Sequence, residues 1–277
     1  MGRITVGSQN GTDIQLYFED HGTGRPVVLI HGFPLDGQAF EAQHRALLEA
    51  GHRVITYDRR GYGRSDHPTE GFDYDTLSDD LAALLDHLDV RDAVLVGFSM
   101  GGGEVLRYLA RHGSGRIAKA VTIGAVGPYL FRADDNPEGV PLDVIESIKD
   151  AIRADRYGFF DGFFENFLNT DQLLGSRVSE GMVAAHKAKA YRASGLATLA
   201  VVDIWGTDFR EDVAKLDVPL LLVHGTEDRI VPLEASSARM PGLVKGARLV
   251  TVEGGPHNIC ATHSDEVNAA LLDFLRS

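Results

Sequence analysis

Apolar positions in the first half of the chain follow two alternating patterns. Short runs of consecutive apolar residues are typical of buried strands, and segments with apolar residues three and four positions apart are typical of helices. Strands are expected at residues 26–30, 53–57, 93–96 and 117–123, with helices between them at 40–50, 74–88 and 100–112. Strands that alternate with helices in this way predict a parallel sheet with helices on both faces.

The two ends of this region have different patterns. Residues 3–6 and 14–19 read as antiparallel strands, because a turn ending in Asn10-Gly11 separates them. Beyond residue 128 the pattern is helical, with an aromatic-rich stretch at 157–168 and helices expected at 141–156, 182–192 and 196–205. Strands return at 219–223 and 248–252, each followed by an expected helix, at 233–240 and 265–275. We therefore predict an α/β core, residues 1–127 and 213–277, interrupted by a helical cap, residues 128–212.

A serine occupies the turn between one predicted strand and the helix that follows it. Ser99 lies in Gly97-Phe98-Ser99-Met100-Gly101, directly after residues 93–96. A G-x-S-x-G sequence between a strand and a helix is the nucleophile elbow of the α/β-hydrolases. Its glycines are expected to avoid clashes with the neighbouring strand and helix. The motif in this context predicts an α/β-hydrolase fold with Ser99 as the nucleophile.

A nucleophilic serine needs a base and a group that orients the base, and this fold supplies them in the chain order Ser, Asp or Glu, His. Asp228 follows the predicted strand 219–223 and is the favoured acid, with Glu227 as the weaker candidate. His257 lies in a loop just after the final predicted strand, residues 248–252, and is the favoured base.

The oxyanion of an acyl-transfer intermediate needs two backbone N–H donors. One is expected from Met100, the residue after the nucleophile, at a helix N-terminus. The other is expected from Phe33, in the loop after the third predicted strand. Pro34 has no N–H to donate and favours an extended backbone at Phe33.

Other candidate residues have structural interpretations. His31 and His224 precede glycines at strand ends, and we expect them to shape loops. His263 is expected to be a surface side chain, and Cys260 a structural residue despite its closeness to His257. The sequence contains no zinc-protease motif, no paired Cys/His ligand set and no phosphate-binding P-loop, so no metal site is predicted.

Composition narrows the class of partner. The chain has 277 residues, 44% of them hydrophobic, and a net charge of −13, which disfavours binding to nucleic acid or to an anionic membrane. A single cysteine rules out an intrachain disulfide. No apolar stretch approaches the roughly 20 residues of a membrane span, and the first residues carry no apolar signal segment. These features predict a cytoplasmic protein.

Longer segments extend the match beyond the elbow, among them HGFPLDG (31–37), YDRRGYGRSD (57–66) and HGTEDRIVP (224–232). In them, and in 74–105, 136–144 and 207–219, the chain resembles the cofactor-free bacterial haloperoxidases, or perhydrolases, and the related arylesterases and γ-lactamases. The resemblance implies a serine hydrolase without metal, haem or other cofactor. Its partners would be a small ester or carboxylic acid together with water or hydrogen peroxide, and the peracid formed from peroxide would oxidise halide.

The resemblance also concerns individual residues. A proline after the oxyanion-loop aromatic is associated with perhydrolase activity, and Pro34 matches it. The aromatic residue itself is often Trp in the family and is Phe33 here. After His257, relatives carry small residues or proline, whereas this chain has 258–260, Asn-Ile-Cys, whose side chains are expected to border the substrate pocket. Family members are often oligomeric, which leaves a homo-oligomer open.

Aromatic residues of the predicted cap are expected to line an apolar, confined pocket that favours aryl or short-chain esters. The expected substrate-binding residues are Pro34, Val126, Phe160, Phe163, Phe164, Trp205 and Ile230. The phenylalanines are spaced three and four apart, which places them on one helix face. Packing of the cap on the core is the alternative role for these rings.

Three other functions remain open. A lactonase or γ-lactamase-type amidase would use the same three residues, so the sequence does not separate it from an esterase. A ligand receptor on a hydrolase scaffold is disfavoured, since a binding protein has no need of a complete triad. A C–C bond hydrolase is disfavoured. Its substrates are charged diketone acids that need a basic cluster in the cap, and no such cluster is evident in the sequence.

Overall fold

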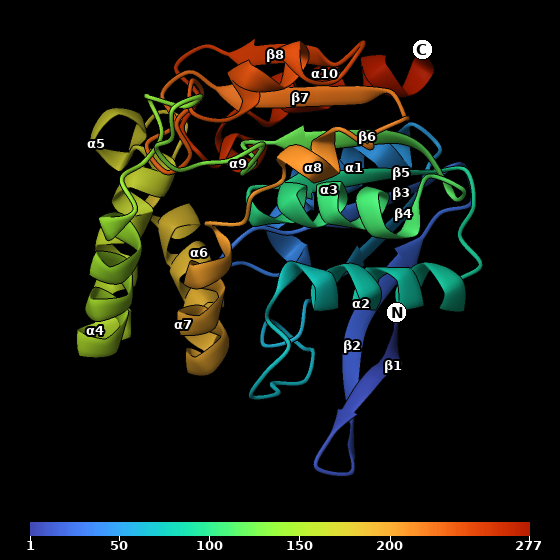
Figure 1. Cartoon of the computed structure of the whole chain (residues 1–277), viewed down its shortest axis with the longest axis horizontal. Coiled ribbons are helices and arrows are strands. Elements are labelled where there is room, and N and C mark those ends of the chain that lie inside the picture. Colours follow the sequence, from blue (N-terminus) through green and yellow to red (C-terminus); the bar gives the residue numbers. More distant parts are fainter.

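The computed structural model describes residues 1–277 and contains one eight-stranded sheet (Figure 1). The strand order is β1-β2-β4-β3-β5-β6-β7-β8. The strands are β1 (Gly2–Gln9), β2 (Thr12–His21), β3 (Pro26–Ile30), β4 (Arg53–Tyr57), β5 (Ala93–Phe98), β6 (Ile117–Ile123), β7 (Leu220–Gly225) and β8 (Arg248–Val252). The β1–β2 and β2–β4 pairs are antiparallel and the others parallel, which confirms the predicted α/β-hydrolase sheet.

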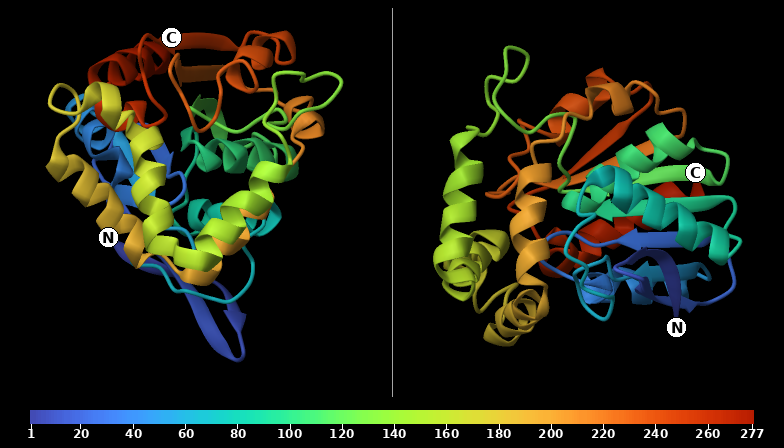
Figure 2. Two further views of the ribbon diagram at one scale, coloured as in Figure 1. Left: turned by 90° about the vertical axis from the view of Figure 1, so that its left-hand side faces the viewer. Right: turned by 60° about the horizontal axis from the view of Figure 1, so that its bottom comes forward.

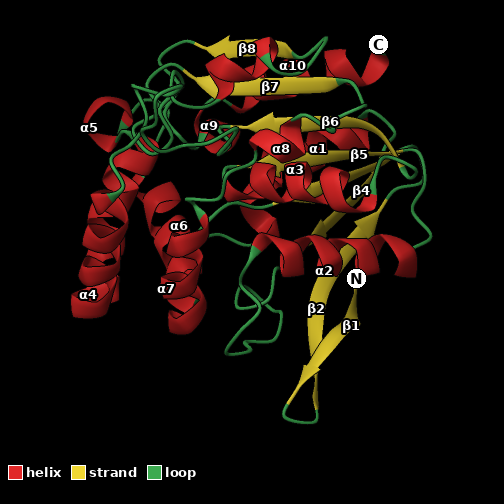
Figure 3. Ribbon diagram, in the orientation of Figure 1, coloured by secondary structure: helices red, strands yellow, loops and turns green.

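Helices cover both faces of the sheet, as Figure 3 shows in red. One face carries α2 (Tyr74–His87), α3 (Met100–His112) and the short α8 (Arg210–Val213), and the other carries α1 (Glu41–Glu49) and α10 (Ser264–Arg276). Because both faces are covered, the central strand β5 is buried at all six positions. Short helical turns complete the core: η1 (Gly37–Phe40), η2 (Ser237–Gly242) and α9 (Ile259–Thr262).

Four helices between β6 and β7 lie beyond the carboxyl ends of the parallel strands (Figures 1 and 2). They are α4 (Asp143–Leu168), α5 (Thr170–Leu173), α6 (Glu180–Arg192) and α7 (Gly195–Ile204). Residues 210–212, which the sequence analysis assigned to the cap, instead form part of α8 and pack against α3 of the core. An ion pair between Asp212 and Arg107 of α3, 3.1 Å long, holds them there.

Helix α4 joins two segments that the sequence analysis treated separately. Asp155 has non-helical backbone angles, φ −158° and ψ 96°, and divides α4 into two arms (Figure 2, left). Its carboxylate accepts the N–H groups of Tyr157 and Gly158, both at 3.0 Å, as an N-cap does. The second arm therefore begins as a new helix in a different direction.

The helix predicted at 233–240 is wrong. The structure has only the 3-10 turn η2 in this region, at Ser237–Gly242. Pro241 lies inside that turn, and a proline cannot donate the backbone hydrogen bond that a longer helix would need there.

A buried ion pair lies beneath the turn that carries Ser99. The guanidinium of Arg59, in the loop after β4, contacts the carboxylate of Glu104 in α3, and the side chains are 1% and 0% exposed. The hydroxyl of Tyr57 donates to the same carboxylate, and burial together with Glu104 raises the pKa of Tyr57 well above its usual value. The pair ties α3 to the β4 loop from within the core.

We predict that Glu104→Gln lowers the free energy of unfolding by about 3–5 kcal/mol, because it leaves the Arg59 charge buried without its partner. Urea unfolding followed by circular dichroism measures the change. The matched control is Asp273→Asn, which breaks the half-exposed ion pair between Arg248 of β8 and Asp273 of α10. An exposed pair contributes little, so equal effects of the two substitutions would contradict the importance of the buried pair.

Candidate active site

Ser99 occupies a strained turn between β5 and α3. Its backbone angles are φ 54° and ψ −120°, a region that residues with a side chain rarely adopt. A Cβ atom at Gly97 would lie 2.2 Å from the carbonyl oxygen of Gly101, and one at Gly101 would lie 2.2 Å from the carbonyl oxygen of Ile30. The predicted steric role of these two glycines is therefore confirmed.

Three side chains from separate loops form one chain of hydrogen bonds. His257 Nε2 lies 2.8 Å from Ser99 Oγ, and His257 Nδ1 lies 2.7 Å from Asp228 Oδ2. Asp228 follows β7 and His257 follows β8, so both reach Ser99 at the carboxyl edge of the sheet. The carboxylate accepts a hydrogen bond from the Nδ1–H group, which leaves Nε2 free to accept the hydroxyl proton of Ser99.

The environment of Asp228 keeps its carboxylate ionised. Oδ1 accepts the N–H groups of Ile230 and Val231, at 2.9 and 2.8 Å. Oδ2 contacts His257 and also His224 Nε2, which lies 3.1 Å away. Burial alone would raise the pKa of Asp228, but the two histidines hold it well below its usual value. The alternative acid, Glu227, has an exposed side chain that contacts neither histidine.

Backbone N–H groups are available beside Ser99 for a developing oxyanion. The N–H of Phe33 has no hydrogen-bond acceptor within the protein. Phe33 and Met100 line the same pocket as Ser99 and His257. The loop that carries Phe33 packs close to the serine, since a Cβ at Gly32 would lie 2.8 Å from Ser99 Cβ. Phe33 and Met100 therefore remain the candidate pair of oxyanion donors.

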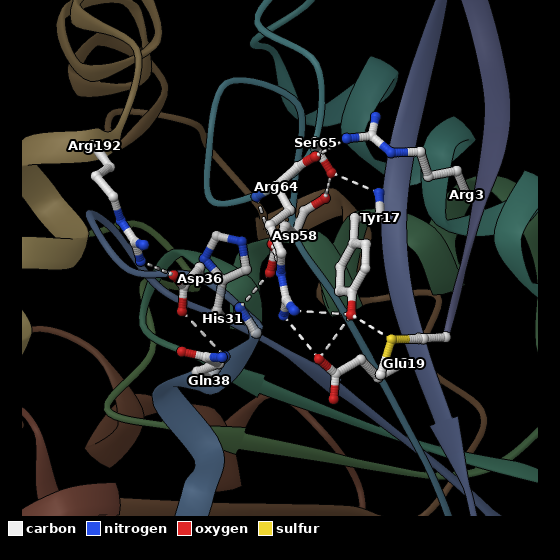
Figure 4. A network of polar contacts seen from close by, with 12 residues as sticks. Arg3, Tyr17, Glu19, His31, Asp36, Gln38, Asp58, Arg64, Ser65 and Arg192 are labelled. Atoms are coloured by element: carbon white, nitrogen blue, oxygen red, sulfur yellow. Dashed lines mark hydrogen bonds and ion pairs between the residues drawn. The ribbon is translucent and has the colours of Figure 1, made fainter.

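A polar network holds the Phe33 loop in place (Figure 4). His31 Nε2 accepts the N–H of Arg59 at 3.1 Å, so His31 Nδ1 is the protonated nitrogen and donates to the carbonyl of Gly32 at 3.0 Å. Burial and the Arg59 charge lower the pKa of His31 well below its usual value, which keeps the ring neutral. The predicted loop-shaping role of His31 agrees with these contacts.

The same network continues past Phe33. The carboxylate of Asp58 accepts the N–H of Gly37 at 2.8 Å and that of Arg64 at 2.7 Å. Asp36 caps η1 and contacts Arg192, at the end of α6, over 3.4 Å (Figure 4). Arg192 thus connects a cap helix to the loop that carries the candidate oxyanion donor.

A pocket of about 700 Å³ opens at Ser99, between the core and α4. Of its 22 lining residues, 14 are hydrophobic, so an apolar ligand fits it better than a charged one. Besides Ser99 and His257, the sequence-predicted residues in the lining are Phe33, Met100, Val126, Phe163, Trp205 and Ile230.

Three predicted substrate-binding residues do not line this pocket. Phe160 and Phe164 are fully buried, and Pro34 is buried in the loop after β3, where the Phe33–Pro34 peptide bond is cis. The rings of Phe160 and Phe33 are 5.9 Å apart, so Phe160 supports the pocket wall from behind. Helical spacing placed Phe160 and Phe164 on one face, but that face points into the core.

Sequence reasoning missed the aliphatic wall of the pocket. The first arm of α4 supplies Val144, Ile145 and Ile148, and Leu130 and Val140 precede it. The spacing of the three residues in α4 was a usable signal, because positions one, two and five of such a series share one face of a helix. The second arm contributes Gly158, Phe159, Gly162, Phe163, Glu165 and Asn166.

The residues after His257 also lie elsewhere than expected. None of Asn258, Ile259 and Cys260 lines the main pocket; Cys260 borders a separate cavity of about 300 Å³. Burial raises the pKa of the Cys260 thiol, in keeping with a structural role. His263 was expected at the surface but is buried, with Nδ1 2.9 Å from the hydroxyl of Thr262.

The structure offers no grouping of three or more His, Cys, Asp or Glu side chains that could hold a metal ion. Its helices are all too short or too polar to cross a membrane.

Comparison with known proteins places this site in a family. The family model described as "alpha/beta hydrolase fold" matches residues 25–264. The chain belongs to the α/β-hydrolase family. A protein named putative non-heme chloroperoxidase, from Synechocystis sp., is 50% identical over the full length of both chains. The bifunctional esterase/perhydrolase of Acinetobacter calcoaceticus is 36% identical, again over both full lengths.

Among solved structures of α/β-hydrolases, the bromoperoxidase from Bacillus anthracis is 44% identical, with a TM-score of 0.95. The match covers 100% of this chain and 99% of that one. These relatives confirm the predicted resemblance to the non-haem haloperoxidases and perhydrolases.

We predict that Asp228→Asn lowers kcat on the order of 10³- to 10⁴-fold, because an amide no longer fixes the tautomer of His257. Steady-state kinetics on p-nitrophenyl acetate measures the loss. Glu227→Gln is the matched control, since its exposed side chain lies one residue away without contacting His257. A comparable loss in Glu227→Gln would contradict the assignment of the acid.

Proposed function

We propose that this protein is a serine ester hydrolase with perhydrolase activity, and that Ser99, His257 and Asp228 are its catalytic triad. The observation that carries the proposal is the unbroken hydrogen-bond chain from Asp228 through His257 to Ser99, ending at an apolar pocket. The names of the Synechocystis and Acinetobacter relatives, a chloroperoxidase and an esterase/perhydrolase, support the same reaction class.

In the first half of the proposed reaction, Ser99 Oγ attacks the ester carbonyl while His257 Nε2 takes its proton. The carbonyl oxygen gains negative charge and accepts hydrogen bonds from the N–H groups of Phe33 and Met100. Collapse of this intermediate expels the alcohol, which receives the proton from His257. The product is an acyl group esterified to Ser99.

In the second half, a small nucleophile attacks the acyl group with His257 again as the base. Water releases the carboxylic acid, and hydrogen peroxide releases the peracid. The peracid carries the oxidising equivalent of peroxide and oxidises halide in solution. Apparent haloperoxidase activity therefore needs only the acyl-enzyme and peroxide.

The lining of the pocket favours uncharged, apolar substrates. Its charged lining residues are Glu165 and Arg229, and Arg229 is already paired with Asp171 of α5 at 2.8 Å. The ring of Phe33 contacts Trp205 and Phe163, with centroids 5.1 and 5.7 Å apart, which forms an aromatic wall beside the serine. A volume of about 700 Å³ accommodates an aryl group as well as a short acyl chain.

The proposed function is tested by measuring nitrophenol and peracetic acid together, with p-nitrophenyl acetate in the presence and absence of hydrogen peroxide. We expect both products, because water and peroxide compete for one acyl-enzyme. Ser99→Ala should lose several orders of magnitude of both activities, and His257→Ala should add no further loss. Release of nitrophenol without peracetic acid would show an esterase that lacks perhydrolase activity. Nitrophenol release no faster than that of the Ser99→Ala variant would exclude an esterase.

The inner edge of α4 generates a prediction on substrate size. A Cβ at Gly162 would meet no atom within 4 Å, although Gly162 lines the pocket. Gly162→Leu should therefore fold normally and narrow the pocket beside α4. We expect kcat/KM to fall on the order of tenfold for p-nitrophenyl phenylacetate and to change little for p-nitrophenyl acetate.

Gly181→Leu is the control for this substitution. Gly181 also lies in a cap helix, α6, but it does not line the pocket, and a Cβ there would meet only Ser179 Oγ at 3.7 Å. It should leave the ratio of the two rates unchanged. An unchanged ratio in Gly162→Leu as well would show that the substrate does not pass this edge of α4.

A further inference from the structure

A second histidine contacts the carboxylate of the proposed triad. His224 lies near the end of β7, four residues before Asp228, and is fully buried. Its Nε2 is 3.1 Å from Asp228 Oδ2, the same oxygen that contacts His257 Nδ1 at 2.7 Å. The reaction proposed above uses His257 and assigns no task to His224.

The contacts of His224 determine which of its nitrogens carries the proton. Nε2 is also hydrogen-bonded to the carbonyl oxygen of Val231, 2.9 Å away, so it faces two acceptors and no donor. A bare nitrogen at this place would repel both oxygens, and Nε2 must therefore be the N–H. The hydroxyl of Ser237 lies 2.8 Å from the other nitrogen, Nδ1.

We propose that His224 is a positioning residue that shares Asp228 Oδ2 with His257 and thereby limits how strongly the carboxylate stabilises a proton on His257. This inference rests on the proposed triad. An N–H group whose positive end lies beside a carboxylate stabilises its negative charge and makes it a weaker acceptor for the next donor. His224 also prevents rotation of the carboxylate, so Oδ2 stays directed at His257.

Few other charged groups act on this pair. On the loop of Asp228, the Glu227 side chain is exposed, and Arg229 is neutralised by Asp171 of α5. On the cap side, His186 of α6 accepts from Asn258 at 2.8 Å, and burial lowers its pKa, which keeps that ring neutral. Ser99 contacts His257 from the β5 side, and it carries no charge.

A purely structural role for His224 makes a different prediction. Val231 and Ser237 lie on the segment that leads from β7 to η2, and His224 anchors that segment whether or not it contacts Asp228. Loss of the anchor alone would lower stability and kcat without moving the pH profile. The pH dependence of kcat/KM therefore separates the two roles.

The test compares His224→Phe, which removes the donor, with His224→Gln, whose amide nitrogen reaches the position of the imidazole Nε2. Without the donor, Asp228 becomes more basic and holds the proton on His257 more tightly, so activity begins at higher pH. We expect the acid limb of kcat/KM for p-nitrophenyl acetate to move up by about half to one pH unit in His224→Phe. His224→Gln should restore the wild-type limb.

Two further variants keep the test decisive. His224→Asn also lacks a group that reaches Asp228, so it should shift the acid limb as expected for His224→Phe. It provides the test if His224→Phe does not fold. Ser237→Ala removes only the partner of Nδ1, so it should lower the melting temperature without shifting the limb. An unshifted limb in a folded His224→Phe or His224→Asn, or an equal shift in Ser237→Ala, would overturn the proposal.

A spectroscopic measurement separates this inference from the proposed function. The His257 Nδ1–H proton, bonded to Asp228, should give a low-field proton NMR resonance without any substrate. We expect the resonance to move further downfield in His224→Phe and His224→Asn, because the bond to Oδ2 strengthens. If the wild-type protein is inactive but the resonance still moves in the variants, the esterase proposal is refuted and the role of His224 stands. If the resonance does not move in the variants, the role of His224 is refuted.

Discussion

The close approach of β3, β5 and α3 is the constraint on which the active site depends. Gly97 and Gly101 let the turn at Ser99 pass within contact distance of neighbouring backbone, and no side chain fits at either position. The serine is therefore held at φ 54°, a conformation that the surrounding sheet and helix must impose. The buried Arg59–Glu104 pair and the network around Asp58 connect this turn to the loops on either side.

The charge state and hydrogen bonding of the site residues depend on their burial at the carboxyl edge of the sheet. Ser99, Asp228 and His257 are all nearly inaccessible to solvent, so each polar atom depends on partners within the protein. Asp228 meets this demand with two backbone N–H donors, a hydrogen bond to His257 and a contact of 3.1 Å with His224. A carboxylate held in this way stays charged inside the core and cannot turn away from His257.

The bent helix α4 determines the shape of the pocket. Its two arms diverge at Asp155, and each arm contributes lining residues: aliphatic side chains from the first, glycines and phenylalanines from the second. Phe160, Phe164 and Phe167 on the buried face join the main hydrophobic core, so the cap and the sheet share one continuous packing unit. The pocket wall therefore combines residues of the cap with residues of the core.

The sequence by itself determined the succession of strands and helices along the chain, the nucleophile elbow, and the choice of Ser99, Asp228 and His257. Local patterns and the order of motifs along the chain carry that information. Tertiary structure alone decided which phenylalanines face the pocket. An apolar helix face can pack against the core or line a ligand pocket, and only the position of neighbouring elements distinguishes the two. It also decided the burial of His263 and the contact of His224 with Asp228. These depend on side chains brought together by folding, whose distances no local pattern encodes.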